Sequence, residues 1–268
     1  MKITIIGTGY VGLVTGTCFA EVGHTVICVD NDESKVKMLQ GGGIPIYEPG
    51  LEEMVKKNVA EKRLSFTSST AEGVANSDVI FIAVPTPPLP DGGVDLSFIE
   101  RVARDIAGAM TSYKIIVDKS TVPVKTGEKV AETIKRYCKA KVEFDVVSNP
   151  EFLREGFAVE DLMHPDRVVI GVASPRPVAA MKEIYLAEDI DKAQIAIAAK
   201  AGLTCGSMTR QYVPNGPHPS ILLASSSSLG MPRKNCLSRK MLKAEPKNAG
   251  TQSGRRLSTH PKERNIRN

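Results

Sequence analysis

The sequence predicts an α/β protein with a Rossmann-like, doubly wound and mostly parallel sheet. Three observations support this fold class. Runs rich in Val and Ile alternate with helical patterns over residues 1–172. These runs show little polar alternation, which is typical of parallel strands buried on both faces. A glycine-rich turn directly follows the first run. The order of strand and helix signals therefore favours an open sheet covered by helices on both faces.

Each element is predicted from its own pattern. Apolar runs predict strands at residues 2–6, 25–29, 64–67, 79–84, 114–118, 144–148 and 167–172. Amphipathic or apolar stretches predict helices at residues 10–23, 32–42, 50–62, 95–110 and 124–139. The second helix is expected to begin at a capping Asp32 and to stop at glycines.

The chain of 268 residues divides into two parts by charge. Residues 1–190 hold 21 Lys and Arg against 27 Asp and Glu, a net charge of −6. Residues 191–268 hold 14 Lys and Arg against 3 Asp and Glu, a net charge of +11. Such an asymmetry indicates that the two parts have different structures.

The domain boundaries follow from this division. Residues 1–187 are expected to form the Rossmann domain, and residues 188–202 are compatible with a helix. Residues 203–268 combine Ser, Pro, Lys and Arg without periodicity, so a disordered basic tail is expected there. The simplest hypothesis is that this tail is out-of-frame translation or is otherwise unrelated to the ancestral sequence.

Composition excludes several classes of protein. No apolar run reaches the roughly 18 residues of a membrane helix, and the N-terminus lacks a signal-peptide pattern, so a cytoplasmic protein is expected. Five cysteines have no metal-type spacing, so no metal site is expected, and Cys18 and Cys28 are expected to be buried free thiols. The basic tail would attract nucleic acid only through unspecific, salt-dependent contacts, because no aromatic interleaving supports sequence readout.

The turn "GTGYVG", residues 7–12, predicts a dinucleotide site. Gly7 permits the tight turn, Gly9 lets the backbone approach a pyrophosphate, and Gly12 lets the helix pack close to the strand. The start of the helix then offers unpaired N–H groups to phosphates. The alternative is a tight β–α turn without a ligand. The strand before the turn, the helix after it and an acidic residue about 20 positions further on together favour the dinucleotide site.

That acidic residue is Asp30, at the end of the second strand. Its carboxylate would accept hydrogen bonds from the adenosine ribose and would repel a 2′-phosphate, so NAD is favoured over NADP.

Two further loops follow strands at the edge where open α/β sheets bind ligands. The loop "VPTPPLPDGG" carries Thr86, and "DKSTVPVKTG" carries Ser120 and Thr121. Each loop also has a purely structural interpretation, as a proline-stiffened connector and as a helix cap respectively.

The stretch "SNPEFLREG" follows the sixth strand and carries Glu151 and Glu155. Carboxylates just past a strand often act as acid–base groups or hold a ligand, although a solvated polar turn is the plain alternative.

Several motifs occur in one order with close spacing: "IGTGYVGLVTGTCFAEVGHTVICVDND", "YEPGLEE", "VPTP…DG", "DKSTVPV", "NPEFLREG" and "HPDRVVIG". Together they resemble the UDP-glucose/GDP-mannose dehydrogenase family, most closely its UDP-glucose 6-dehydrogenase branch. The resemblance runs from Met1 to about Tyr185. It implies the oxidation of the C6 hydroxyl of a nucleotide sugar to a carboxylate, in two NAD-dependent steps through a cysteine-bound intermediate.

The resemblance also implies roles for individual residues. Those expected to contact NAD are Gly7, Gly9, Tyr10, Val11, Gly12, Asp30, Lys35, Thr86, Thr121 and Glu155. Glu151 is expected to be the acid–base residue that handles the hydrolytic water, with Thr121 helping to position it. The UDP-sugar is expected to contact Glu151, Phe152, Leu153, Arg154 and Glu155.

The resemblance breaks off near "KEIYLAED". The family's catalytic lysine, its dimer helix and its glycine-rich cysteine loop have no match further on, and residues 192–268 contain no Asp or Phe. The chain alone is therefore expected to be inactive, and dimer formation through that helix is doubtful. Two alternatives stay open: a non-catalytic NAD-binding module or truncated fragment, and a dehydrogenase of another nucleotide sugar such as GDP-mannose.

Overall fold

The computed structural model describes residues 1–120, 122–123, 125–185, 194–198 and 223–224. All of them belong to one compact unit, Met1–Ser228. The strands are β1 (Lys2–Ile6), β2 (Thr25–Val29), β3 (Leu64–Thr67), β4 (Val79–Ile82), β5 (Lys114–Asp118), β6 (Phe144–Ser148), β7 (Arg167–Val172), β8 (Gln194–Ala198) and β9 (Leu223–Ala224). The helices are α1 (Tyr10–Glu21), α2 (Glu33–Gln40), α3 (Leu51–Ala60), α4 (Thr70–Ala75), α5 (Ser97–Ala109), α6 (Thr126–Tyr137), α7 (Ala158–Met163) and α8 (Val178–Tyr185).

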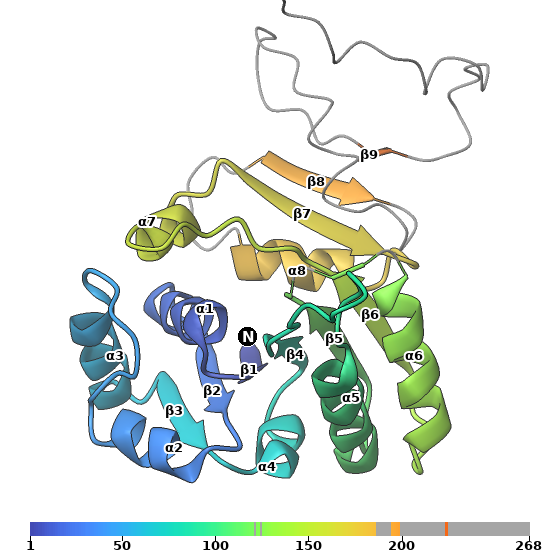
Figure 1. The fold of residues 1–268 in the computed structure, drawn as a ribbon, viewed down its shortest axis with the longest axis horizontal. Helices are drawn as coiled ribbons and strands as arrows, with labels where there is room; N and C mark the ends of the chain where they lie inside the picture. The colour runs from blue at the N-terminus through green and yellow to red at the C-terminus, as the bar shows by residue number, and fades with distance from the viewer. Residues whose placement is uncertain (121, 124, 186–193, 199–222, 225–268) are drawn as a thin grey trace, which may run out of the picture. The chain divides into compact units, whose positions relative to one another are not determined.

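The strands form one sheet in the order β3-β2-β1-β4-β5-β6-β7-β8-β9. Neighbouring strands from β3 to β6 are parallel, and β7 is antiparallel to β6. The first six strands therefore have the doubly wound order 3-2-1-4-5-6, with the topological switch point between β1 and β4. This arrangement, visible in Figure 1, confirms the predicted fold class.

The sheet is buried on both faces. On one face, α1, α2, α3, α7 and α8 share an apolar core with the inward residues of the strands. On the other face, α4, α5 and α6 enclose a second core. The side chains of β4 and β5 are all buried, which explains why these runs lack polar alternation.

The element boundaries follow the predicted patterns closely. Asp32 caps α2, since its carboxylate accepts hydrogen bonds from the backbone N–H groups of Ser34 and Lys35. Strand β4 ends at Ile82, two residues earlier than predicted. The proline-rich loop that begins at Pro85 cannot extend the strand, because proline has no backbone N–H to donate to a neighbouring strand. The short helices α4 and α7 and helix α8 were not predicted, because each has eight residues or fewer and too little periodicity to stand out.

The helix expected over residues 188–202 is wrong where the structure describes that segment. Gln194–Ala198 form strand β8, which pairs in parallel with β7. The sequence there alternates isoleucine and alanine, a period of two that suits a strand. The disorder expected for residues 203–268 falls outside the described residues, except for Leu223–Ala224, which form β9 beside β8.

Cys18 and Cys28 are buried free thiols, as predicted. Burial raises the pKa of each to about 12, so neither is a reactive thiolate at neutral pH. Within the described residues, no helix is long and apolar enough to cross a membrane, and no cluster of three metal-ligating side chains occurs.

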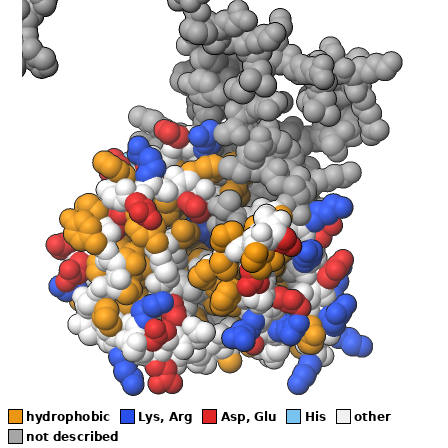
Figure 2. Space-filling view, viewed as in Figure 1, with side chains coloured by type: hydrophobic (Ala, Val, Ile, Leu, Met, Phe, Trp, Pro, Cys, Tyr) orange, Lys and Arg blue, Asp and Glu red, His pale blue; other side chains and the backbone are white. Residues whose placement is uncertain are grey.

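Figure 2 shows hydrophobic and charged side chains interspersed on the face viewed there. The large hydrophobic residues that the described part exposes are Met38, Tyr47, Leu89, Phe98, Tyr137, Phe152 and Phe157. Three of these, Tyr47, Phe152 and Phe157, belong to the loops that meet at the candidate site described next.

Candidate dinucleotide and substrate site

The glycine-rich turn has the geometry that a close β–α connection needs. Gly7 lies at φ +103°, and a Cβ there would sit 2.4 Å from the carbonyl oxygen of Ala83. A Cβ on Gly12 would sit 1.9 Å from the carbonyl oxygen of Gly7. Gly9, in contrast, faces open space, with no atom within 4 Å of a Cβ built there. The turn is therefore closed on its protein side and open at Gly9, where a ligand's phosphates would approach.

Asp30 lies at the end of β2, beside this turn. Its Oδ2 accepts hydrogen bonds from the backbone N–H of Thr8 at 2.9 Å and from the Thr8 hydroxyl at 2.6 Å. The ammonium of Lys35 lies 3.0 Å from the same oxygen. Burial alone would raise the pKa of Asp30, but the hydrogen bonds from Thr8, Asp32 and Lys35 outweigh it and lower that pKa. Asp30 is therefore an ionised acceptor at neutral pH.

The loops after β4 and β5 meet at the same edge of the sheet. The hydroxyl of Ser120 donates to the carbonyl oxygen of Val84 at 2.9 Å, which joins the two loops. Thr86 is half-buried in the first loop. Thr121 lies outside the described residues.

Two buried titratable residues were not singled out from the sequence: Asp118, which ends β5, and Lys119, which directly follows it. Asp118 is almost fully buried, and burial raises its pKa to about 7. Burial lowers the pKa of the neighbouring Lys119 to about 8, which the charge of Glu151 partly opposes. The Lys119 ammonium donates to Asn149 Oδ1 at 3.3 Å and to the Tyr185 hydroxyl at 3.2 Å.

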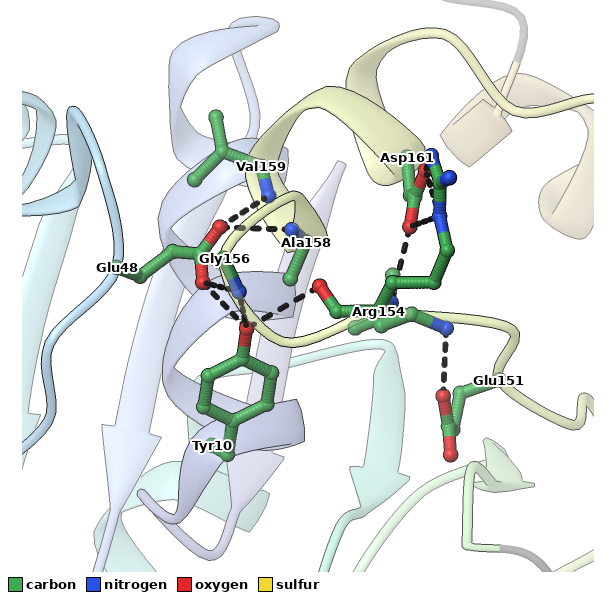
Figure 3. Close-up of polar contacts among 9 residues, drawn as sticks. Tyr10, Glu48, Glu151, Arg154, Gly156, Ala158, Val159 and Asp161 are labelled. Atoms are coloured by element: carbon green, nitrogen blue, oxygen red, sulfur yellow. Dashed lines mark hydrogen bonds and ion pairs between the residues drawn. The ribbon is translucent and has the colours of Figure 1, made fainter. Parts of the chain in front are cut away.

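The segment Glu151–Glu155 follows β6 and folds into a turn. The carboxylate of Glu151 accepts from the backbone N–H of Leu153 at 2.7 Å (Figure 3). Arg154 donates from its backbone N–H at 2.9 Å and from its guanidinium to Asp161 on α7. The Arg154 side chain is therefore engaged within the fold, whereas Glu155 is exposed.

A cavity of about 490 Å³ lies against this segment. Phe152, Leu153 and Arg154 line one side of it, and other lining residues are Lys119, Asn149, His164, Arg167 and Tyr185. The lining is mixed in charge, because the cationic side chains of Lys119, Arg154 and Arg167 are balanced by the carboxylates of Glu160, Asp161 and Asp166. A polar lining of this kind suits a ligand with hydroxyl groups.

Glu48 is the residue that sequence reasoning missed most plainly. It lies in the loop between α2 and α3 and is 3% exposed. Its carboxylate accepts hydrogen bonds from the Tyr10 hydroxyl and from the backbone N–H groups of Gly156 at 2.9 Å and Ala158 at 2.7 Å (Figure 3). These partners lie 38, 108 and 110 positions away in the chain. Only the motif "YEPGLEE" drew attention to this loop, and nothing local in it reveals the partners.

The Tyr10 side chain has a different environment from the one expected for a cofactor contact. Tyr10 begins α1, next to Gly9, but its hydroxyl points to Glu48 and also accepts from the N–H of Gly156 at 3.1 Å. Burial and the Glu48 carboxylate raise the pKa of Tyr10 to about 12. Any contact of Tyr10 with a cofactor phosphate would therefore come from its backbone N–H. That assignment, like those of Val11, Lys35 and Thr86, stays a prediction.

The parallel sheet, the closed glycine turn and the ionised carboxylate at the end of β2 define a dinucleotide-binding domain of the NAD-dependent dehydrogenase class. Residues 1–188 match the UDP-glucose/GDP-mannose dehydrogenase family, NAD binding domain. The chain therefore belongs to this family, and the matched residues are its NAD-binding domain.

Individual relatives agree with this assignment. The chain is 50% identical over 184 residues to the UDP-glucose 6-dehydrogenase TuaD of Bacillus subtilis, which covers 69% of this chain and 40% of that protein. It is 53% identical over 188 residues to the UDP-glucose 6-dehydrogenase of Rhizobium meliloti, which covers 69% of this chain and 43% of that protein. The chain thus spans about two fifths of the length of these relatives.

Solved structures show the same fold. A UDP-glucose dehydrogenase from Pyrobaculum islandicum superposes with a TM-score of 0.68 at 43% identity, over 72% of this chain and 45% of that one. A GDP-mannose dehydrogenase from Pseudomonas aeruginosa superposes with a TM-score of 0.68 at 37% identity, over 74% of this chain and 45% of that one.

Proposed function

We propose that this chain supplies the NAD site and one wall of the sugar site for the UDP-glucose 6-dehydrogenase reaction. That reaction converts UDP-glucose, two NAD and water to UDP-glucuronate and two NADH. The observation that carries the proposal is the convergence of the glycine turn, Asp30 and the Glu151–Glu155 segment at the carboxyl ends of the parallel strands.

Each group has a role that its geometry supports. The open side of Gly9 and the first N–H groups of α1 suit the pyrophosphate, and the ionised Asp30 suits the ribose hydroxyls. NAD, when bound, accepts the hydride from the sugar carbon. The cavity beside Phe152, Leu153 and Arg154 suits the sugar of the second ligand.

We assign acid–base catalysis to Glu151, with Thr121 positioning the hydrolytic water. Glu151 follows β6 at the ligand edge of the sheet, and one oxygen of its carboxylate is fixed by the N–H of Leu153. A carboxylate held in this way keeps a second oxygen for a water molecule. Glu155, exposed and four residues further on, is assigned to the cofactor side.

The chain by itself is proposed to bind NAD without completing the reaction. Residues 189–268 contain no match to the family's glycine-rich cysteine loop. Without that nucleophile, the second oxidation and the hydrolysis lose their covalent route. In the alternative, the chain is a non-catalytic module that binds NAD and takes no part in the reaction of the sugar.

The alternative of another nucleotide sugar has one specific observation in its favour. The GDP-mannose dehydrogenase superposes as well as the UDP-glucose enzyme does, although at lower identity. The described residues therefore carry the fold common to both, and the choice of nucleotide is left to the test.

The test is NADH formation at 340 nm by the purified chain, with UDP-glucose and with GDP-mannose in parallel. The proposal expects no steady-state turnover with either sugar. Two NADH formed per UDP-glucose would contradict the proposed incompleteness. Turnover with GDP-mannose alone would overturn the substrate assignment.

A further inference from the structure

Glu48 joins its own loop to two other parts of the chain, which lie beside the cofactor turn and beside the Glu151–Glu155 segment. Its loop precedes α3, while its hydrogen-bond partners are the first residue of α1 and the backbone of residues 156–159. The first partner stands next to Gly9 of the cofactor turn. The second begins immediately after the Glu151–Glu155 segment.

Both oxygens of the Glu48 carboxylate are used. Oε2 accepts from the Tyr10 hydroxyl and from the N–H of Gly156 at 2.9 Å. Oε1 accepts from the N–H of Ala158 at 2.7 Å and from that of Val159 at 3.4 Å. Burial alone would raise the pKa of Glu48, but these donors lower it, so the group is ionised at neutral pH.

The start of α7 receives this carboxylate, and within the described residues its first backbone N–H groups have no cap from the N-cap side chain. Helix α7 begins after Phe157. Glu48, from a loop more than 100 positions away in sequence, satisfies its first N–H groups instead. Gly156 lies at φ +83°, so the chain turns sharply at the point that Glu48 holds.

Tyr10 completes the connection from the cofactor side. Its hydroxyl lies within reach of Glu48, the N–H of Gly156 at 3.1 Å and the carbonyl oxygen of Arg154 at 3.4 Å (Figure 3). The same residue opens the helix whose N-terminus would meet the pyrophosphate. The first residue of α1 therefore contacts the Glu151–Glu155 segment at Arg154 and the residue that follows it, Gly156.

We propose that Glu48 is a positioning residue that, through Tyr10, couples occupancy of the cofactor turn to the order of the Glu151–Glu155 segment. The proposal rests on the proposed function, since it takes the glycine turn as the NAD site and the segment as the sugar wall. The coupling is reciprocal, so occupancy of either site is expected to favour the ordered form of the other.

Hydrogen exchange of the purified chain, with and without saturating NAD, tests this coupling. In the unchanged chain, NAD is expected to slow amide exchange both at residues 7–12 and at residues 151–163. The loss of one hydrogen bond to a charged group corresponds to about tenfold or more in local opening. Glu48→Gln is therefore expected to speed exchange at residues 156–159 by about tenfold.

The decisive readout is the effect of NAD in the variant. A purely structural cap predicts faster exchange in Glu48→Gln with the NAD-dependent protection of residues 151–163 retained. The coupling proposed here predicts that this protection is lost while protection of residues 7–12 persists. Retention of NAD-dependent protection at residues 151–163 in Glu48→Gln would overturn the inference.

Two further variants keep the result interpretable. Tyr10→Phe removes only the hydroxyl and is expected to uncouple the two sites even if Glu48→Gln fails to fold. Glu52→Gln, an exposed carboxylate on α3 that pairs with Lys56, is the matched control and is expected to behave as the unchanged chain. Absence of NAD protection at residues 7–12 in the unchanged chain would count against the proposed cofactor site, and so is distinct from failure of the coupling.

Discussion

At the scale of single residues, Gly12 and Gly9 of the cofactor turn serve different purposes, close packing and open access respectively. A Cβ on Gly12 meets a backbone oxygen at 1.9 Å, whereas a Cβ on Gly9 meets nothing within 4 Å. Gly9 also has φ −70°, which alanine tolerates. Packing therefore excludes a side chain at Gly12, whereas at Gly9 only the approach of a ligand would exclude one.

Gly12→Ala is expected to destabilise the chain by about 1–3 kcal/mol, the usual cost of overpacking against a rigid neighbour. Gly9→Ala is expected to leave the unfolding midpoint unchanged and to weaken NAD binding, because the added methyl group occupies the open approach. Urea unfolding and NAD titration of both variants check this. Gly108→Ala, an exposed helix position with no atom near its Cβ, serves as the control. Equal stability of the Gly9 and Gly12 variants would contradict this interpretation.

Lys119 is expected to make the stability of the folded chain increase with pH. Burial lowers its pKa to about 8 in the folded chain, from 10.5 unperturbed. Above about pH 8 the folded state holds Lys119 neutral while the unfolded state still binds the proton, so the stability of the folded state rises with pH up to about 10.5.

The measurement is the difference in unfolding free energy between the unchanged chain and Lys119→Met, followed from pH 7 to pH 10. The difference is expected to shift in favour of the unchanged chain as pH rises, by at most about 1.4 kcal/mol per pH unit. Taking the difference removes the titration of the buried cysteines from the comparison. A difference independent of pH would show that Lys119 titrates normally.

At the scale of elements, α1 is the centre of the fold. It is buried along most of its length, from Gly12 to Ala20. Phe19 on α1 packs against Phe81 of β4 and Tyr185 of α8, with ring centroids 5.3 Å apart in both pairs. The helix that starts at the glycine turn thus helps to hold α8 against the sheet, together with the direct contact of α8 with β7.

Phe19→Ala is expected to cost about 3–5 kcal/mol, because it leaves a cavity among three elements. The exposed Phe98→Ala on α5 is the matched control and is expected to stay within about 0.5 kcal/mol of the unchanged chain. Chemical denaturation monitored by circular dichroism checks both. Similar losses in the two variants would show that α1 is not the packing centre described here.

The elements also show how far the sequence predicts the structure. The seven strands up to residue 172 were predictable because most are short Val/Ile-rich runs that lie between turn signals and alternate with helical patterns. The strand at Gln194–Ala198 was not, since a short alanine-rich run also suits a helix. The tight packing of the glycine turn was predictable from spacing, whereas its contacts with a cofactor stay a prediction. The role of Glu48 was not predictable, because all its partners are brought together only by the tertiary fold.

At the scale of the whole molecule, the sites meet at one edge of the sheet, but only part of the family's length is present. The chain spans 40% and 43% of the two UDP-glucose 6-dehydrogenases compared above. The family's NAD binding domain matches residues 1–188 of this chain. Cofactor binding is therefore the property expected of this chain, and the absence of full turnover remains the proposal that the NADH measurement tests.

The central claim is that residues 1–188 form a working NAD site, and calorimetric titration of the purified chain with NAD tests it most directly. The account predicts saturable binding of one NAD per chain. Asp30→Ala should weaken this binding by about tenfold or more, because hydrogen bonds to a charged group are lost. Asp105→Ala, an exposed carboxylate on α5, should leave it unchanged. No heat at millimolar NAD, or equal binding by the folded Asp30→Ala variant, would contradict the account.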